Sequence, residues 1–271
     1  DGTIPHLLFS GSAGVGKTTL AKILINSLGV NKFDTLEINA SRENSVEVIR
    51  EKITNFVGTM SFGDFKVVLL DEADYISPNG QAALRGVMET YASNARFILT
   101  CNYPNKIIPA LHSRCQGFHI EKVDKTDFTS RIAQVLIDEN VEFDLDVLDS
   151  YIKATYPDLR KCLNMCQMNS NGGTLASPQG DEGGTQDYKL SAVDMFKQGK
   201  IKEARQLLCT SVRPDDMEEV YRWLYDNLDL FGDTDEMRDK AILSIRNGLV
   251  NHSFVADPEI NLSATLVELT T

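Results

Sequence analysis

The chain has 271 residues, of which 42% are hydrophobic and 24% are charged, and its formal net charge is −12. This composition is typical of a soluble globular protein of about two domains. No apolar run approaches the roughly 18 residues of a membrane span, and no signal peptide is recognised, so we expect a cytoplasmic protein with no membrane partner. The acidic excess lies in the C-terminal half, because residues 1–120 carry 11 basic and 11 acidic side chains. A local basic surface for nucleic acid therefore remains open in the first module.

The first 120 residues alternate short apolar runs with helical patterns, which predicts a parallel sheet with helices on both faces. The runs "KVVLL" and "RFILT" are almost continuously apolar, as expected of strands that are covered on both sides. We expect strands at 6–10, 35–39, 66–70, 96–101 and 118–120. We expect helices near 18–28, 45–57 and 81–91.

From residue 124 onward the pattern is helical. Helices are predicted at 124–140, 143–155 and 156–168, with Pro157 in a first helical turn. Residues 169–186 are rich in Gly and Ser and predict a linker or a disordered segment. Further helical patterns lie at 191–198, 200–209, 216–228, 235–253 and 258–269. The expected organisation is a first module at 1–122, a small helical domain at 123–168, a linker at 169–186 and an all-helical domain at 187–271.

A phosphate-binding loop lies between the first expected strand and helix. The stretch "GSAGVGKT" fits the Walker A pattern G-x-x-x-x-G-K-[ST]. Its glycines let backbone N–H groups surround phosphate oxygens, and the following helix adds its positive dipole end. Lys17 can reach the β- and γ-phosphates, and Thr18 can hold Mg²⁺. The predicted cofactors are ATP and Mg²⁺, and the predicted ATP-binding residues are Gly11, Ser12, Ala13, Gly14, Val15, Gly16, Lys17, Thr18 and Thr19.

Polar residues at the ends of two later strands complete a hydrolytic site. In "VVLLDEAD", Asp71 is the expected second Mg²⁺ ligand, and Glu72 is the expected base that polarises the attacking water. Without the Walker A loop, both would be ordinary loop acids after a strand. Asn102 follows "FILTC" and would hold the water in line, although an Asn before "YP" also suits a simple turn.

Two arginines are candidates for stabilising charge on the transferred phosphoryl group. Arg114 lies in "HSRCQ", on an expected loop, and Arg160 lies in the first turn of an expected helix in "YPDLRKCLN". An arginine in contact with that group accelerates phosphoryl transfer by roughly 10³–10⁵-fold. A solitary surface arginine is the alternative interpretation of either residue.

These motifs, in this order and spacing, resemble the clamp-loader branch of the AAA+ ATPases. The segments "EINASRENSVEVIREKI" and "GQAALRGVMETYASNARFILTCNYPNKIIPALHSRC" are similar to the small subunits of replication factor C. The resemblance covers about residues 1–168. Over the final 85 residues, the similarity is limited to the helical pattern expected of a collar domain. The short architecture is most similar to the ATPase subunit of T-even-type bacteriophage clamp loaders, which would work in the host cytoplasm.

The resemblance implies roles and partners. Asn102 and Arg160 would be the two sensors of the subunit's own ATP, and Arg114 would be a finger inserted into the site of a neighbouring subunit. The fold implied is an AAA+ P-loop module, a helical lid domain and an all-α collar that holds subunits together. The implied assembly is a pentameric ring or spiral of different subunits that loads a sliding clamp onto primer–template DNA. ATP binding would open the clamp, and hydrolysis would release it closed on DNA.

Positions that match family positions facing DNA are Arg42, Arg50, Lys52 and Arg85. Arg42 and Arg50 lie eight residues apart and share a helix face if the helix begins early enough. The alternative is a solvated helix whose basic residues pair with Glu47 and Glu51. DNA contact of this kind would read backbone shape and would weaken with salt.

The stretch "FVGTMSFGDF" suggests a contact with the clamp. Met60 and Phe62 lie in a Gly-flanked connection, where exposed apolar side chains suit a hydrophobic pocket on a partner. Packing of both side chains into their own domain is the simpler interpretation.

Other classes remain as alternatives. The DEAD stretch also occurs in superfamily-two helicases, but those carry Ser-Ala-Thr after the next strand and a second sheet domain. A helicase loader or a branch-migration motor would share the ATP-site residues. A scaffold subunit that binds nucleotide without turnover would be free to lose Lys17, Glu72 and Arg114, which are all present.

Overall fold

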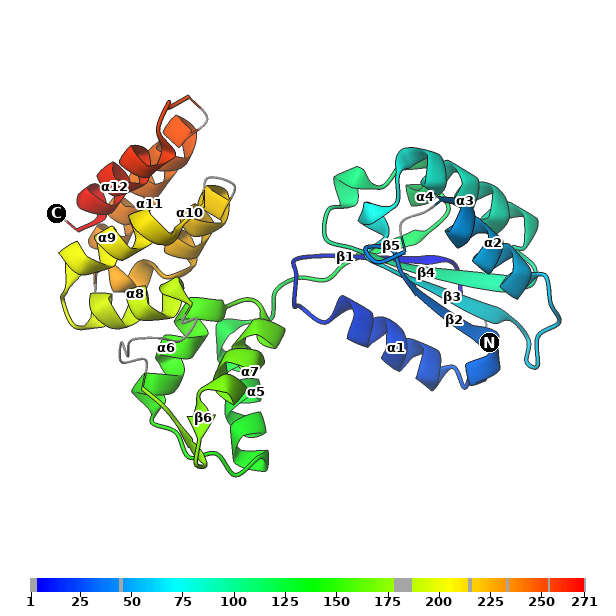
Figure 1. Cartoon of the computed structure of the whole chain (residues 1–271), viewed down its shortest axis with the longest axis horizontal. Helices are drawn as coiled ribbons and strands as arrows, with labels where there is room; N and C mark the ends of the chain where they lie inside the picture. The colour runs from blue at the N-terminus through cyan, green and yellow to red at the C-terminus, as the bar shows by residue number, and fades with distance from the viewer. Residues whose placement is uncertain are drawn as a thin grey trace. The chain divides into compact units, whose positions relative to one another are not determined.

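We analysed a computed structural model of the chain, shown in Figure 1. The structure describes residues 4–43, 46–177, 187–213, 216–232, 234–252 and 254–270. It divides into two compact units, Asp1–Val123 and Asp124–Thr271, and each is described by itself. Within the described ranges, every helix is too short or too polar to span a bilayer.

The first unit is a five-stranded parallel sheet in the order β2-β3-β4-β1-β5. Its strands are β1 (Leu7–Ser10), β2 (Thr35–Asn39), β3 (Lys66–Asp71), β4 (Ala95–Cys101) and β5 (Gln116–His119). Its α-helices are α1 (Lys17–Ser27), α2 (Val46–Val57), α3 (Pro78–Thr90) and α4 (Pro109–His112), with 3₁₀ turns η1 (Lys32–Asp34), η2 (Ala73–Tyr75) and η3 (Pro104–Lys106).

The sheet is covered on both faces, as the apolar strands predict. Figure 1 shows α1 on one side of the sheet and α2, α3 and α4 on the other. Alternate strand residues divide between two cores, so Val67 and Leu69 pack with the α1 side while Val68 and Leu70 pack with the other. Side chains that alternate along a strand point to opposite faces, which is why one apolar run supplies both cores.

Two of the predicted elements in this unit differ from the sequence prediction by more than one residue. Strand β5 runs from Gln116 to His119 rather than over 118–120, and all four of its residues are exposed. Helix α3 begins at Pro78 rather than near residue 81, because Ser77 caps it by accepting from the N–H of Gly80. Proline at the first helical position is compatible with this start, since its missing N–H has no partner there anyway.

The second unit is mainly helical and contains two hydrophobic cores. Helices α5 (Lys125–Asp138), α6 (Leu145–Thr155) and α7 (Leu159–Met168) surround the first core, together with Leu175 and Leu190. The second core joins α8 (Tyr188–Lys197), α9 (Ile201–Ser211), α10 (Met217–Asp226), α11 (Asp235–His252) and α12 (Pro258–Leu269) with the turn η5 (Leu228–Leu230). The division of this unit into a lid and a collar remains a proposal that two separate cores support.

Two expectations for this unit need correction. Residues 169–186 were expected to lack regular structure, yet β6 (Ser170–Asn171) pairs antiparallel with β7 (Thr174–Leu175), and Leu175 is buried. Residues 178–186 of that segment lie outside the described residues. Pro157 precedes α7 rather than starting it, because Asp158 is the cap and accepts from the N–H of Lys161.

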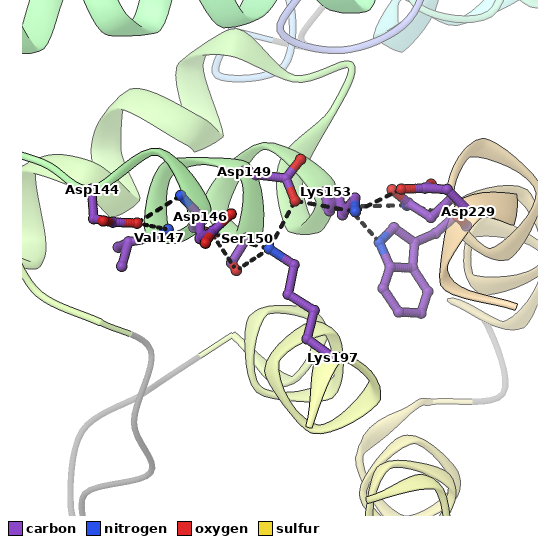
Figure 2. A network of polar contacts seen from close by, with 10 residues as sticks. Asp144, Asp146, Val147, Asp149, Ser150, Lys153, Lys197 and Asp229 are labelled. Atoms are coloured by element: carbon purple, nitrogen blue, oxygen red, sulfur yellow. Dashed lines mark hydrogen bonds and ion pairs between the residues drawn. The ribbon is translucent and has the colours of Figure 1, made fainter. Parts of the chain in front are cut away.

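A network of charges ties α6 to both α8 and η5, as Figure 2 shows. Lys153 bridges Asp149, at 3.1 Å, and Asp229, at 2.6 Å, while Lys197 bonds Asp149 at 2.7 Å. The backbone carbonyl of Lys153 also accepts from the indole N–H of Trp223 at 2.8 Å. These contacts join residues of the two cores within this unit.

Candidate nucleotide site

The residues of the predicted phosphate loop connect β1 to α1. Gly16 is the N-cap of α1 in the left-handed region, at φ 96°, and no side-chain hydrogen bond caps this helix start. A Cβ on Gly11 would collide with the carbonyl oxygen of Ile120. Glycine is therefore required at both positions, by conformation at one and by close approach at the other. The uncapped first turn of α1 offers N–H donors of the kind that bind phosphate.

Lys17 is the first residue of α1, directly after the loop, and is only 7% exposed. Its Nζ donates to the carbonyl oxygens of Gly11 at 2.9 Å and Ser12 at 2.6 Å. It also donates to Oδ1 of Asn102 at 2.8 Å. The lysine of the phosphate loop and the asparagine after β4, 85 residues apart, are thus in direct contact.

Thr18 and Asp71 meet at the same edge of the sheet. The Thr18 hydroxyl donates to Oδ1 of Asp71 at 2.6 Å. Thr100, on β4, donates to the same oxygen at 2.7 Å, and Nδ2 of Asn39, the last residue of β2, lies 3.5 Å from Oδ2. A hydroxyl and a carboxylate side by side are the hard oxygen ligands that Mg²⁺ prefers, so this pair fits the predicted metal.

Glu72 follows Asp71 with an unusual backbone conformation. It lies in the left-handed region at φ 57° and ψ 45°, which is uncommon for a residue other than glycine. Its N–H donates to the Thr100 hydroxyl at 3.0 Å, and its carbonyl accepts from Tyr75 at 3.0 Å. Such backbone conformations cluster at functional sites, where surrounding bonds hold them.

Asn102 directly follows β4, and a buried carboxylate holds its backbone. Oδ2 of Asp74 accepts from the N–H groups of Asn102 at 3.3 Å and Tyr103 at 3.2 Å. Burial and the nearby charge of Asp74 raise the pKa of Cys101 to about 11, so this thiol stays neutral and unreactive at physiological pH.

The sequence analysis did not single out Thr100 or Asp74. The available signals were weak: a hydroxyl at the end of the otherwise apolar run "RFILT", and a third acid in "LLDEAD". Both residues act through contacts with positions 28 or 29 residues away, which local patterns do not reveal.

Arg114 lies beyond α4, in the predicted loop, and is held by its own unit. Its guanidinium pairs with Glu89 on α3 and donates to the carbonyl of Ala110 at 2.8 Å. Glu89 also pairs with Arg85, at 3.5 Å. The predicted finger and one predicted DNA-contacting residue therefore share one carboxylate.

Arg160 belongs to the second unit. It is exposed in the first turn of α7, as predicted, two residues after the cap Asp158. Its role as a sensor of the nucleotide remains a prediction.

The other predicted DNA contacts lie on and before α2. Arg42, in a turn, and Arg50, on the helix, are exposed. Lys52 is also exposed and pairs with Glu43 at 2.8 Å. The side chain of Glu47 lies outside the described residues.

Met60 and Phe62 do not pack into their domain, so the simpler interpretation of this stretch was wrong. Met60 is 92% exposed and Phe62 is 78% exposed. The Phe62 ring lies 6.0 Å from the ring of Phe33, which is 76% exposed. The buried carboxylate of Asp34 accepts from the N–H groups of Phe62 at 2.8 Å and Gly63 at 2.9 Å, which fixes the loop backbone.

Known proteins share this arrangement of sheet, loop and helices. Residues 7–123 match the family described as "ATPase family associated with various cellular activities (AAA)". A RuvB structure from Thermotoga maritima, a single-residue variant, superimposes with a TM-score of 0.55 over 82% of this chain and 79% of that one. At 15% identity, that likeness concerns the fold alone. The fold and the loop therefore define a P-loop ATPase of the AAA class.

Sequence relatives define the family more narrowly. The replication factor C small subunit of Methanococcus vannielii is 36% identical over 228 residues, which are 83% of this chain and 70% of that protein. The protein of the same name from Sulfurisphaera tokodaii is 42% identical over 179 residues, 65% of this chain and 55% of that protein. The chain belongs to the replication factor C small-subunit family.

Proposed function

We propose that this chain is an ATP-hydrolysing subunit of a sliding-clamp loader. The observation that carries the proposal is one contact set at the sheet edge. Thr18 of the phosphate-loop motif bonds Asp71, the last residue of β3, and Lys17 bonds Asn102, which follows β4. Three separated motifs thus converge where a nucleotide phosphate is expected in a parallel α/β sheet. The small-subunit family supports clamp loading, and a bacteriophage-type loader is the finer proposal.

The phosphate loop would bind and orient ATP. Lys17 and the N–H groups of Gly14 to Thr18 would hold the phosphate oxygens, with the dipole of α1 favouring their negative charge. Thr18 and Asp71 would hold Mg²⁺, which screens charge on the β- and γ-phosphates. Lys17 would exchange part of its present hydrogen bonding for phosphate oxygens when ATP binds.

The acid–base step would belong to Glu72 and Asn102. Glu72 would accept a proton from the attacking water, and the Asn102 amide would hold that water in line with the γ-phosphate. Arg160 would approach the same phosphate from the second unit as a sensor. Each of these residues acts on the subunit's own nucleotide.

Arg114 would complete the site of a neighbouring subunit. In this chain it is paired with Glu89 on α3. For the Arg114 guanidinium to reach the γ-phosphate bound by a neighbouring subunit, its ion pair with Glu89 would have to break. Turnover would then depend on assembly, which suits a machine whose other partners are further subunits in a pentameric spiral.

Mixing two inactive variants tests the role of Arg114 in trans. Arg114→Ala should lower turnover stimulated by clamp and primed DNA by roughly 10³–10⁵-fold, because the transition-state charge loses its arginine. Glu72→Gln should be inactive through its own site. Assemblies that contain both variants should regain part of the activity, since a Glu72→Gln subunit still offers Arg114 to its neighbour. Absence of any recovery, or full activity of Arg114→Ala alone, would contradict a finger in trans.

The stimulation pattern tests clamp loading itself. ATP hydrolysis by the purified assembly should rise synergistically with a sliding clamp and primed DNA. Stimulation by a duplex junction or by a helicase would instead indicate a branch-migration motor or a helicase loader. Nucleotide binding without turnover would indicate a scaffold subunit.

Contacts with DNA and clamp are assigned to separate surfaces of the first unit. Arg42, Arg50, Lys52 and Arg85 would contact the DNA backbone, and replacing one phosphate contact should reduce the salt dependence of binding by about one unit of slope. The exposed Met60 and Phe62, with Phe33 beside them, would enter an apolar pocket on the clamp. Replacing Met60 and Phe62 by Ala should weaken clamp affinity and leave clamp-free ATPase intact. An unchanged clamp affinity would rule this surface out.

A further inference from the structure

Asp71, the last residue of β3, and Thr100, the penultimate residue of β4, form a polar junction at the proposed nucleotide site. The strands are paired from Lys66 with Ala95 to Leu70 with Leu99, so Asp71 and Thr100 come next on the two strands. Thr100 is 1% exposed, and Leu99 and Cys101 on either side of it are fully buried. A buried hydroxyl in an apolar strand is costly unless both of its hydrogen-bonding functions are satisfied.

The hydrogen bonds of Thr100 have only one consistent assignment. The backbone N–H of Glu72, 3.0 Å away, can only donate, so the Thr100 oxygen must accept from it. The single hydroxyl proton is then left for Oδ1 of Asp71, at 2.7 Å. One side chain thus contacts both the predicted metal ligand and the backbone of the predicted base.

Asp74 makes a second connection between the segments that follow β3 and β4. Its Oδ2 accepts from the N–H groups of Asn102 and Tyr103, which follow β4, while the residue itself follows Glu72 by two positions. Asp74 is 8% exposed, so these bonds lie away from solvent. Two side chains therefore join the Glu72 turn to the end of β4 and the segment after it: Thr100 bonds the backbone of Glu72, and Asp74 bonds the backbone of Asn102 and Tyr103.

We propose that Thr100 is a positioning residue for hydrolysis, which rests on the proposed ATPase function. Through its hydroxyl, Thr100 orients the Asp71 carboxylate toward the metal and holds the left-handed backbone of Glu72, so that the Glu72 side chain faces the water. Thr100 itself touches neither nucleotide nor water. Its removal lowers the rate of the chemical step more than the affinity for ATP.

Matched substitutions separate this role from packing. Thr100→Val keeps the branched shape and loses the hydroxyl, whereas Thr100→Ser keeps the hydroxyl and loses a buried methyl group. A packing role predicts that Ser is the more harmful change. The positioning role predicts that Thr100→Val lowers kcat more than Thr100→Ser does. Thr100→Ala compared with Thr100→Ser repeats the test without the methyl group, should the valine variant fail to fold.

The readouts are stimulated kcat and KM of the assembly, the Mg²⁺-dependent part of the affinity for a fluorescent ATP analogue, and the unfolding temperature without nucleotide. Thr100→Val should lower kcat by about tenfold or more, as expected for losing a hydrogen bond to a charged group. It should also reduce the affinity gained on adding Mg²⁺, while affinity in EDTA stays near wild type. Thr100→Ser should keep kcat within about threefold of wild type, even if its unfolding temperature falls.

Equal kcat for Thr100→Val and wild type, or an equal loss of kcat in Thr100→Val and Thr100→Ser, would overturn the proposal. Both outcomes leave the proposed ATPase function standing, because the wild-type assembly is active in them. A wild-type assembly that neither binds nor hydrolyses Mg²⁺-ATP would instead reject the proposed function, and this inference with it.

Discussion

The start of α1 in the first unit differs from the starts of five helices in the second unit. Among the described helices of the second unit, α5, α6, α7, α8 and α12 each begin at an aspartate whose side chain accepts from first-turn N–H groups. Helix α1 of the first unit begins at Gly16, with no side-chain cap. An aspartate cap satisfies the helix N-terminus with the protein's own carboxylate.

A missing side-chain cap alone does not mark a binding helix, because α9 and α10 also begin without one. At α1 the uncapped start coincides with the phosphate loop, and there the difference separates stability from binding. A helix whose N-terminus is capped by an aspartate carboxylate gains stability, and fewer of its first-turn N–H groups remain for a bound anion such as phosphate. The uncapped α1 forgoes that gain, roughly 1 kcal/mol for a cap, and keeps its N–H donors for a phosphate. The same logic predicts that nucleotide, when bound, supplies the missing interaction.

Replacing a lysine in each unit gives the largest expected contrast. Lys17→Ala should lower nucleotide affinity by more than about 100-fold, because the phosphates lose a buried cation. Lys153→Ala should lower the stability of the second unit and leave nucleotide affinity within about twofold, because Lys153 pairs with Asp149 and Asp229 instead. Titration with a fluorescent ATP analogue, alongside thermal unfolding, measures both. Equal losses of affinity would mean that the two lysines do not have the separate roles assigned here.

Adding nucleotide should stabilise one unit selectively. At 100 times its dissociation constant, ATP should stabilise the binding unit by about 2.7 kcal/mol. Hydrogen exchange of peptides from α1 should slow accordingly, whereas peptides from α9 and α12 should not change. ADP without Mg²⁺ serves as the weaker-binding comparison. Uniform protection of both units would show that α1 is not the helix that receives the phosphate.

The parallel sheet and most helix positions follow from sequence periodicity, because buried strands and amphipathic helices leave strong apolar patterns. Strand β2 and helix α12 lie where they were predicted. Strand β5 was misplaced because all four of its residues are exposed, so it lacks an apolar pattern. The pair β6 and β7 was missed because strands of two residues are too short for a periodic signal.

The candidate site was predictable in its motifs and not in its supporting bonds. Lys17, Thr18, Asp71 and Asn102 belong to motifs with known chemistry, and the structure brings these four together. Thr100, Asp74 and Glu89 were missed because their roles depend on which segments meet across the sheet and helices. That information lies in the tertiary contacts rather than in any local pattern.

Removing one aspartate cap should have a moderate effect on stability alone. The Asp144 carboxylate accepts from the N–H of Asp146 at 2.8 Å and of Val147 at 3.4 Å, at the start of α6 (Figure 2). Asp144→Ala should destabilise the second unit by about 1 kcal/mol, and Asp144→Asn by only a few tenths, since Asn caps nearly as well. Chemical denaturation followed by Trp223 fluorescence reports on this unit. A loss as large for Asn as for Ala would point to the charge, rather than the hydrogen bonds, as the stabilising element.

The smallest expected effect concerns the charge network on α6. Burial alone would raise the pKa of Asp149, but hydrogen bonds from Lys197 and Lys153 hold that pKa below its ordinary value. Burial alone would lower the pKa of Lys153, but hydrogen bonds to Asp229 and Asp149 hold it above its ordinary value. The network therefore contributes stability above about pH 4, which is lost as pH falls through the lowered pKa of Asp149, and again as pH rises through the raised pKa of Lys153.

Asp149→Asn should accordingly reduce the unfolding free energy by about 0.5–1 kcal/mol between roughly pH 5 and 9. The difference from wild type should shrink below about pH 4, because protonated Asp149 no longer attracts the two lysines. Asp235→Asn is the matched control, since Asp235 is 96% exposed and pairs with Arg238 at 3.6 Å. Urea unfolding at several pH values measures both variants. A pH-independent loss for Asp149→Asn would show that the side chain stabilises α6 by shape rather than by charge.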